Sequence, residues 1–139
     1  MAQTYSTEMA GLVANPVSLP SGGIVDGNVR VKRATITLAS QPSGDTIVIA
    51  KKRAGEAFLY GLIHASATLG ATATIAIGVA GTAGKYRAAA THTATVPTFF
   101  GVNASIEEEI ADEDVIITIA AAALPSSGRL VVDMYYSGT

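Results

Sequence analysis

The 139-residue sequence has no cysteine and no tryptophan, and only 6% of its residues are aromatic. The lack of cysteine excludes disulfide bridges, thiolate nucleophiles and cysteine-ligated zinc or iron–sulfur sites. Charged residues are also few, at 14%, and the net charge is −2. We therefore expect no nucleic-acid partner, because nucleic-acid-binding proteins carry an excess of positive charge.

Long hydrophobic runs are missing as well. The longest apolar run, residues 115–124, is about half as long as a membrane-spanning helix must be. Residues 1–23 have neither a basic start nor a continuous apolar segment, so they do not read as a secretory signal. We therefore expect no membrane partner and a soluble product of cytoplasmic synthesis.

Hydrophobic residues nevertheless make up 49% of the chain, and many of them are alanine and valine. A chain of this length forms one ordinary domain. Burial of apolar surface contributes roughly 25 cal/mol per Å², so a core of small side chains gives less stability per residue. The composition therefore favours self-association.

The first 27 residues are interrupted by turn-forming pairs, NP at 15–16, LPSGG at 19–23 and DG at 26–27. We predict an extended N-terminal arm over residues 1–27, not a helix. Its scattered apolar side chains indicate that it lies against a partner surface, and the candidate interface residues are Tyr5, Met9, Leu12, Val13, Val17 and Leu19.

From Asn28 onward, short segments alternate apolar and polar residues between turns, which is typical of β-strands. About seven such segments, with no long amphipathic helix, favour an all-β domain over an α+β domain. We predict that residues 28–139 form a single antiparallel β-sandwich or jelly roll. The expected elements are a strand over 28–38 with a bulge near Lys32 and Arg33, a strand over 45–53, a central strand over 57–67, a light strand over 69–78, a loop over 79–101 with a short strand near Tyr86, one or two helical turns over 105–114, and a final hairpin of 115–122 with 128–136.

The light strand, LGATATIAIG at residues 69–78, carries isoleucine on one face and small residues on the other. This pattern suits a strand whose heavy face enters the core while its light face approaches another backbone closely. We predict that the light face meets a neighbouring subunit, with Thr72, Thr74 and Ala76 as interface residues.

A glycine-rich segment at residues 78–86, GVAGTAGKY, has some features of a phosphate-binding loop. The required leading glycine falls on Val79, and Tyr86 stands where serine or threonine would ligate magnesium. We interpret the segment as a connection between strands.

Two histidines, His64 and His92, are candidates for a general base or a metal ligand, since imidazole titrates near neutrality and binds zinc. Neither lies in a helical pattern with a carboxylate, and Ser66 lacks the flanking glycines of a nucleophile elbow. We therefore expect no enzyme activity and no catalytic, cofactor-binding or metal-binding residues.

The charged residues cluster by sign. Residues 107–114 contain six of the eleven acidic residues, which is compatible with a cation site or with a solvated acidic turn. The basic cluster comprises Arg30, Lys32, Arg33, Lys51, Lys52 and Arg53. These opposite regions can meet between neighbouring subunits or simply keep the protein soluble. The glycosylation-like triplet at Asn103 is interpreted as a chance match.

Two stretches resemble a known family. They are GDTIVIAKKRAGEAFLYGLIHASATLGATATIAIGV at 44–79 and ADEDVIITIAAAALPSSGRLVVDMYYSG at 111–138. In order and pattern they resemble the small decoration (cement) proteins encoded beside capsid genes in tailed bacteriophages. The resemblance implies a β-sandwich or jelly-roll subunit without catalytic residues, commonly a homotrimer. It also implies that the protein binds the major capsid protein on the outer surface of the virion head and stabilises the shell.

Two alternatives stay open at this stage. One is a tail, neck or fibre-associated phage structural protein, because these also use small β-sandwich oligomers. The other is a carbohydrate-binding β-sandwich module, although its binding platform normally presents tryptophan or tyrosine and this chain has no tryptophan and five tyrosines.

Overall fold

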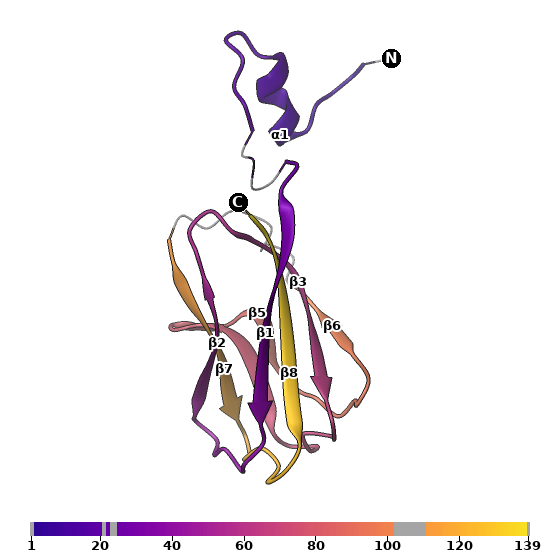
Figure 1. The fold of residues 1–139 in the computed structure, drawn as a ribbon, viewed down its shortest axis with the longest axis vertical. Helices are drawn as coiled ribbons and strands as arrows, with labels where there is room; N and C mark the ends of the chain where they lie inside the picture. The colour runs from indigo at the N-terminus through magenta and orange to yellow at the C-terminus, as the bar shows by residue number, and fades with distance from the viewer. Residues whose placement is uncertain (1, 21, 23–24, 102–110, 139) are drawn as a thin grey trace.

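The eight strands form two antiparallel four-stranded sheets that pack face to face (Figure 1). Alternation of apolar and polar side chains gives each sheet an apolar face that packs against the other sheet. The computed structural model describes residues 2–20, 22, 25–101 and 111–138. Sheet A has the order β1-β8-β3-β6, and sheet B has the order β2-β7-β4-β5. The predicted all-β, antiparallel sandwich or jelly-roll class is confirmed. The elements are α1 (Thr7–Ala10), η1 (Gly11–Val13), β1 (Asn28–Thr37), β2 (Thr46–Lys52), β3 (Ala57–Ala65), β4 (Thr74–Val79), β5 (Thr82–Thr91), β6 (Thr98–Phe100), β7 (Glu113–Ala120) and β8 (Arg129–Gly138).

The core lies between the sheets and is centred on one aromatic group. The ring of Phe58 contacts Tyr86 at 4.7 Å, Tyr136 at 5.7 Å and Phe100 at 6.1 Å between centroids. Aliphatic side chains from β4, β7 and β8 fill the remaining space. As predicted, β3 is a central strand, because it pairs with both β8 and β6.

The bulge predicted near Lys32 and Arg33 is wrong. The pairing of β1 with β8 runs without a register shift from Asn28 to Thr37. Two adjacent charged residues fit a regular strand here because each has a carboxylate partner, Glu56 for Lys32 and Asp133 for Arg33, on opposite faces of the sheet. The alternation therefore persists through the charged pair.

The predicted loop over residues 79–101 is also wrong in its main part. β5 is a ten-residue strand that forms a hairpin with β4. Two register shifts interrupt this pairing, and such bulges break the period-two pattern on which the prediction relied. A Cβ at Gly78 of β4 would collide with the Thr82 and Ala83 carbonyl oxygens, so the light face of β4 meets the backbone of its own hairpin at this point.

The predicted final hairpin is wrong as well, because β7 belongs to sheet B and β8 to the centre of sheet A. The connection between them crosses the end of the sandwich. Leu124, 3% exposed, packs into the core there, and its N–H donates to the Gln41 carbonyl. Adjacent strands with a turn between them normally pair, but burial of this loop leucine directs them to different layers. The helical turns predicted over 105–114 fall largely outside the described residues, and Glu113 begins β7.

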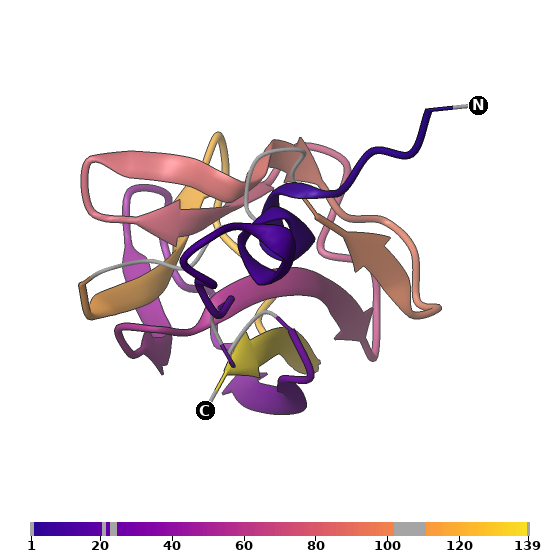
Figure 2. The ribbon, with the colours of Figure 1, turned by 90° about the horizontal axis from the view of Figure 1, so that it is seen from above.

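The N-terminal segment lies beyond one end of the sandwich, near the start of β1 (Figures 1 and 2). The prediction of a wholly extended arm is wrong for residues 7–13, which form the helical turns α1 and η1. Ser6 caps α1 by accepting a hydrogen bond from the Met9 N–H. The division of the chain at residue 27 stays a prediction.

Candidate functional site

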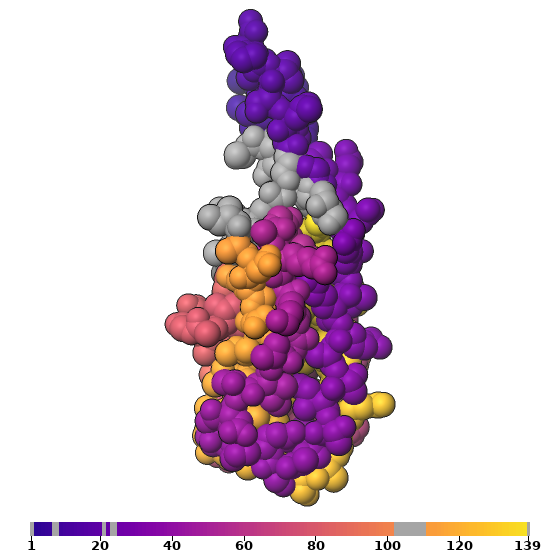
Figure 3. All heavy atoms as spheres, turned by 60° about the vertical axis from the view of Figure 1, so that its left-hand side comes forward, coloured from indigo at the N-terminus to yellow at the C-terminus, as the bar shows by residue number. Residues whose placement is uncertain are grey.

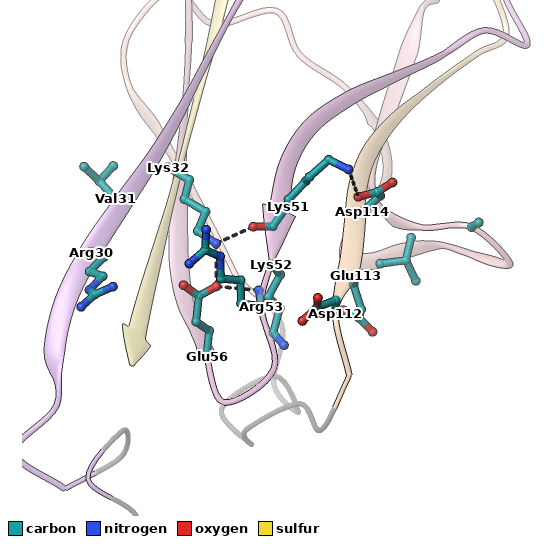
Figure 4. Close-up of a pocket in the computed structure, with 12 residues that line it drawn as sticks. Arg30, Val31, Lys32, Lys51, Lys52, Arg53, Glu56, Asp112, Glu113 and Asp114 are labelled. Carbon is teal, nitrogen blue, oxygen red and sulfur yellow. Dashed lines mark hydrogen bonds and ion pairs between the residues drawn. The ribbon is translucent and has the colours of Figure 1, made fainter. Parts of the chain in front are cut away.

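A charged groove of about 910 Å³ opens where the β1 edge of sheet A faces the β2 edge of sheet B. Basic residues of β1 lie on one side of it, and on the other side the lysines of β2 lie beside acidic residues at the start of β7 (Figure 4). Its lining residues are Arg30, Val31, Lys32, Lys51, Lys52, Arg53, Glu56, Val79, Ala80, Asp112, Glu113 and Asp114. The groove brings most of the predicted basic cluster together with part of the acidic run, and both belong to the same subunit.

Lys32 and Glu56 form the central contact of the groove. Lys32 Nζ donates to Glu56 Oε2 at 2.5 Å and to the Lys51 carbonyl at 2.6 Å, and it lies 4.9 Å from the centroid of the Tyr136 ring. The Arg53 N–H also donates to Glu56 Oε2, at 2.9 Å. Desolvation works to raise the pKa of Glu56, but these hydrogen bonds and the charges of Lys32 and Lys52 hold it below its usual value.

A second carboxylate, Glu113, anchors the opposite side. Lys85 Nζ donates to Glu113 Oε1 at 2.6 Å, and the Tyr86 hydroxyl donates to Oε2 at 3.0 Å. Desolvation again opposes ionisation, yet these contacts and the Lys52 charge lower the pKa of Glu113. Lys52 is 1% exposed, and its charge acts on both glutamates. The two ion pairs therefore join into one charged network beneath the groove.

This network ties together the open edge of the sandwich. The described residues that line the groove include no serine, threonine, cysteine or histidine. Its lysines face carboxylates of the same groove, including Lys51, which lies 3.4 Å from Asp114. A surface compensated in this way lacks the unbalanced positive charge of a nucleic-acid site.

The acidic run is only partly described. Asp112 Oδ1 accepts the Ala54 N–H at 2.8 Å, while Glu113 and Asp114 face lysines. Within residues 2–20, 22, 25–101 and 111–138, no group of three or more potential ligands is placed to hold a metal ion. The remainder of the run, residues 107–110, lies outside the described residues, as does the triplet at Asn103.

The two histidines have different neighbours, Asp133 for His64 and Arg87 for His92. His64 Nε2 lies 3.5 Å from Asp133 Oδ2, and Asp133 is held by Arg33 through hydrogen bonds of 2.6 and 2.7 Å. Ser66 Oγ accepts a hydrogen bond from the Arg129 N–H, which links the end of β3 to the start of β8. His92 is 3% exposed, and burial, followed by the nearby Arg87 charge, lowers its pKa.

The predicted interface residues of the arm are mostly exposed. Exposure is 51% for Tyr5, 39% for Leu12, 58% for Val13, 62% for Val17 and 80% for Leu19, while Met9 is half-buried. Space-filling atoms show the arm as a narrow projection above the body (Figure 3). The subunit itself therefore does not cover these apolar side chains.

The other predicted interface residues, on and before β4, differ among themselves. Thr72 is exposed and Thr74 is half-buried. Ala76 is 4% exposed within the subunit and has almost no surface to lose on assembly. An interface role for Thr72 and Thr74 stays a prediction.

Sequence reasoning missed a surface on the outer face of sheet A. The Tyr60 ring stacks on Tyr135 at 4.6 Å and on Phe99 at 5.5 Å. These three residues, hereafter the aromatic ladder, cross β8, β3 and β6. Val31 on β1 is paired with Tyr135 and is 54% exposed, and Phe99 is 66% exposed. Alternation places Phe99 and Tyr135 on the outer face, and a register shift between Phe58 and Tyr60 turns Tyr60 outward while Phe58 stays in the core. Cross-strand pairing, which the sequence does not reveal, brings the three rings together.

The described part of the molecule is thus a β-sandwich with a charged groove at one edge, an aromatic ladder on the outer face of sheet A and an exposed apolar arm. In that part, no helix is long and apolar enough to span a membrane. No protein-family model matches the chain, and no curated protein matches it.

Solved structures with the same fold come from phage capsids. A chain of the cyanophage Pam1 capsid asymmetric unit matches with a TM-score of 0.63 and 20% identity, and a chain of the Ralstonia phage GP4 capsid with 0.66 and 17%. Both matches cover 81% of this chain and 86% of the other. A chain of the acid-stable capsid of Helicobacter pylori bacteriophage KHP30 matches with a TM-score of 0.60 and 10% identity. This match covers 78% of this chain and 86% of the other. At these identities the matches establish a shared fold.

Proposed function

We propose that this protein is a structural virion protein, a decoration (cement) protein that binds the outer surface of a phage head and stabilises it. The observation that carries the proposal is the shared fold with chains of three phage capsid structures. Each match covers a similar fraction of this chain and of the other chain, so each matched chain is about as long as this one. A short accessory chain fits this size better than a shell-forming subunit does.

The uncovered surfaces give the proposal a mechanism. The protein self-associates, as a homotrimer, and contacts the major capsid protein across neighbouring capsomers. Apolar arm residues and the exposed Thr72 region contribute contact area. Because binding occurs to the assembled shell and not to its separate subunits, it stabilises the shell by mass action.

Purified protein should be added to heads assembled from the cognate major capsid protein alone. We expect it to co-sediment with these heads, to add density on the outer surface in electron micrographs and to raise their disruption temperature. Heads of an unrelated phage serve as the control. Failure to bind the cognate heads would contradict the proposal.

A tail, neck or fibre location is the alternative within the same setting, and copy number separates the two. Labelling of virions should place many copies over the head, whereas a tail component is present in few copies at one vertex. Density confined to the tail would replace the head proposal with this alternative.

The aromatic ladder removes Tyr60 as a stacking surface for the carbohydrate-binding alternative. Tyr135 and Phe99 stack on Tyr60 at interplanar angles of 14° and 23° from strands on opposite sides of β3. Both faces of the Tyr60 ring are therefore covered, and a sugar cannot stack on that ring.

A further inference from the structure

Within the described residues, two apolar surfaces are exposed, and both are apolar enough to pack against each other. One is the N-terminal arm, and the other is the outer face of sheet A around the aromatic ladder. We propose that the arm of one copy docks on this face of a neighbouring copy. The inference rests on the self-association in the proposed function and is independent of capsid binding.

The receiving face combines apolar area with a fixed shape. Val29 and Val31 extend the aromatic ladder across the β1 edge, with exposures of 61% and 54%, and Phe99 ends it with 66%. Stacking holds the rings of Tyr135, Tyr60 and Phe99 in place, so little side-chain entropy is lost on binding. Exposed apolar patches of this kind mark interaction surfaces.

The row next to the aromatic ladder limits where a partner can sit. Arg33, Asp133 and Leu62 are register partners in that row, and His64 lies two residues further along β3. Arg33 engages both carboxylate oxygens of Asp133, and His64 Nε2 lies 3.5 Å from Asp133 Oδ2. Asp133 is 1% exposed and already compensated. An uncharged segment can therefore lie along the aromatic ladder without leaving a buried charge unpaired.

The arm fits this requirement. Between Ala2 and Pro20 the sequence has a single charged residue, Glu8. The segment is also folded before docking, because the Ser18 N–H donates to the Gly11 carbonyl at 2.8 Å and closes the chain back on η1. Leu12, Val13 and Leu19 point to solvent in the single copy, so a preformed apolar element is available to a partner.

The position of the arm favours a second copy over the subunit's own sheet. It lies beyond the end of the sandwich and not along sheet A (Figures 1 and 3). Arm and receiving face are different surfaces, so each copy offers one of each to its neighbours. Contacts of this kind, repeated from copy to copy, form a ring such as the proposed trimer when the rotation between copies closes.

Engineered cysteines test the contact cleanly because the chain has none. The arm variant is Val13→Cys and the face variant is Val31→Cys, and the control variant Val48→Cys lies on sheet B. These valines are matched in exposure, at 58%, 54% and 57%. The arm variant carries a mass tag, is mixed with either partner variant, and is oxidised gently with diamide before non-reducing electrophoresis and mass spectrometry.

We expect the tagged arm to form disulfide-linked heterodimers with the face variant at least tenfold more than with the control variant. Equal yields for the two mixtures would overturn the inference. So would a Val13→Cys/Val31→Cys double variant that closes its disulfide within one chain, since the arm would then cover its own sheet.

A substitution provides a second readout without cysteine. Phe99→Ser should shift the sedimentation of the full chain toward the monomer, while Val48→Ser should leave it unchanged. A monomeric wild-type protein, or an oligomer unaffected by Phe99→Ser, would contradict arm docking. Binding to heads, measured separately, can succeed in either case, so failure of this inference is distinguishable from failure of the proposed function.

Discussion

Lys32 Nζ on β1 meets Glu56 Oε2, just before β3, at 2.5 Å, and the same Nζ reaches the Lys51 carbonyl on β2. A single lysine thus ties sheet A to the edge of sheet B at the point where the sandwich is open. The side chains of Lys32 and Glu56 are 22% and 9% exposed, so the pair is largely shielded from solvent screening.

Glu56→Gln should therefore destabilise the fold by about 1–3 kcal/mol, because a shielded lysine loses its charged acceptor. Urea unfolding followed by circular dichroism measures this difference. Asp114→Asn is the control, since the Lys51–Asp114 pair has side-chain exposures of 80% and 57% and should change stability by less than about 1 kcal/mol. An equal effect of both variants would mean that burial at Glu56 does not strengthen its pair.

The same glutamate gives an acid dependence with a definite sign. The pKa of Glu56 is lower in the folded protein than its ordinary value of 4.5. Its contribution to stability is full above that value and is lost as the pH falls through the lower folded pKa. Below pH ~4.5 the unfolding free energy of wild type should fall more steeply than that of Glu56→Gln, and parallel curves would contradict this.

His92 predicts a separate loss of stability at milder acidity. Burial and the Arg87 charge lower its pKa in the folded state, so the unfolded chain takes up a proton first as the pH falls. Stability is therefore full above pH ~6.5 and decreases below it, by at most about 1.4 kcal/mol per pH unit. Urea unfolding between pH 5 and 7.5 should show this slope in wild type and a flatter profile in His92→Gln. A wild type without the slope would show that His92 does not stay neutral on folding.

The light strand yields a packing prediction. Gly78→Ala places a methyl group against the Thr82 and Ala83 carbonyl oxygens, which are backbone atoms and cannot rotate away. We expect destabilisation by about 1–3 kcal/mol in thermal or urea unfolding. Gly101→Ala is the control, because its Cβ would have ordinary contacts of 3.8 Å or more. Similar stability of both variants would show that the hairpin shifts easily.

Most strands are predictable from the local sequence pattern even where they contain a register shift, as β2 and β3 do. The segments that became β1, β2 and β3 alternate or are apolar on both faces, and each was expected within a few residues. The sequence predicts a loop where β5 forms, because β5 has extra residues opposite Ile75, Ile77 and Val79 of β4 and these remove the simple period. The pairing of β8 with β1 and β3 depends on contacts far apart in sequence, which periodicity does not encode.

The surfaces were predictable to a smaller extent. The charged clusters and the apolar arm are visible as composition. The aromatic ladder is not, because Tyr60, Phe99 and Tyr135 are spread over 76 positions and come together only through sheet A. The light face of β4 was expected to meet a neighbouring subunit, whereas Ala76 is already buried inside one subunit.

Thr72 carries the part of the β4 prediction that assembly can test. It is exposed and precedes the buried part of the strand, so a neighbouring copy can cover it. Thr72→Arg would place a long charged side chain in such a contact and should weaken self-association at least tenfold, equivalent to about 1.4 kcal/mol. Sedimentation over a concentration series measures the change. Thr46→Arg, at an exposed position on β2, is the matched control. If the two variants assemble as strongly as wild type, Thr72 lies outside the interface, and the small side chains of β4 serve the β4–β5 hairpin alone.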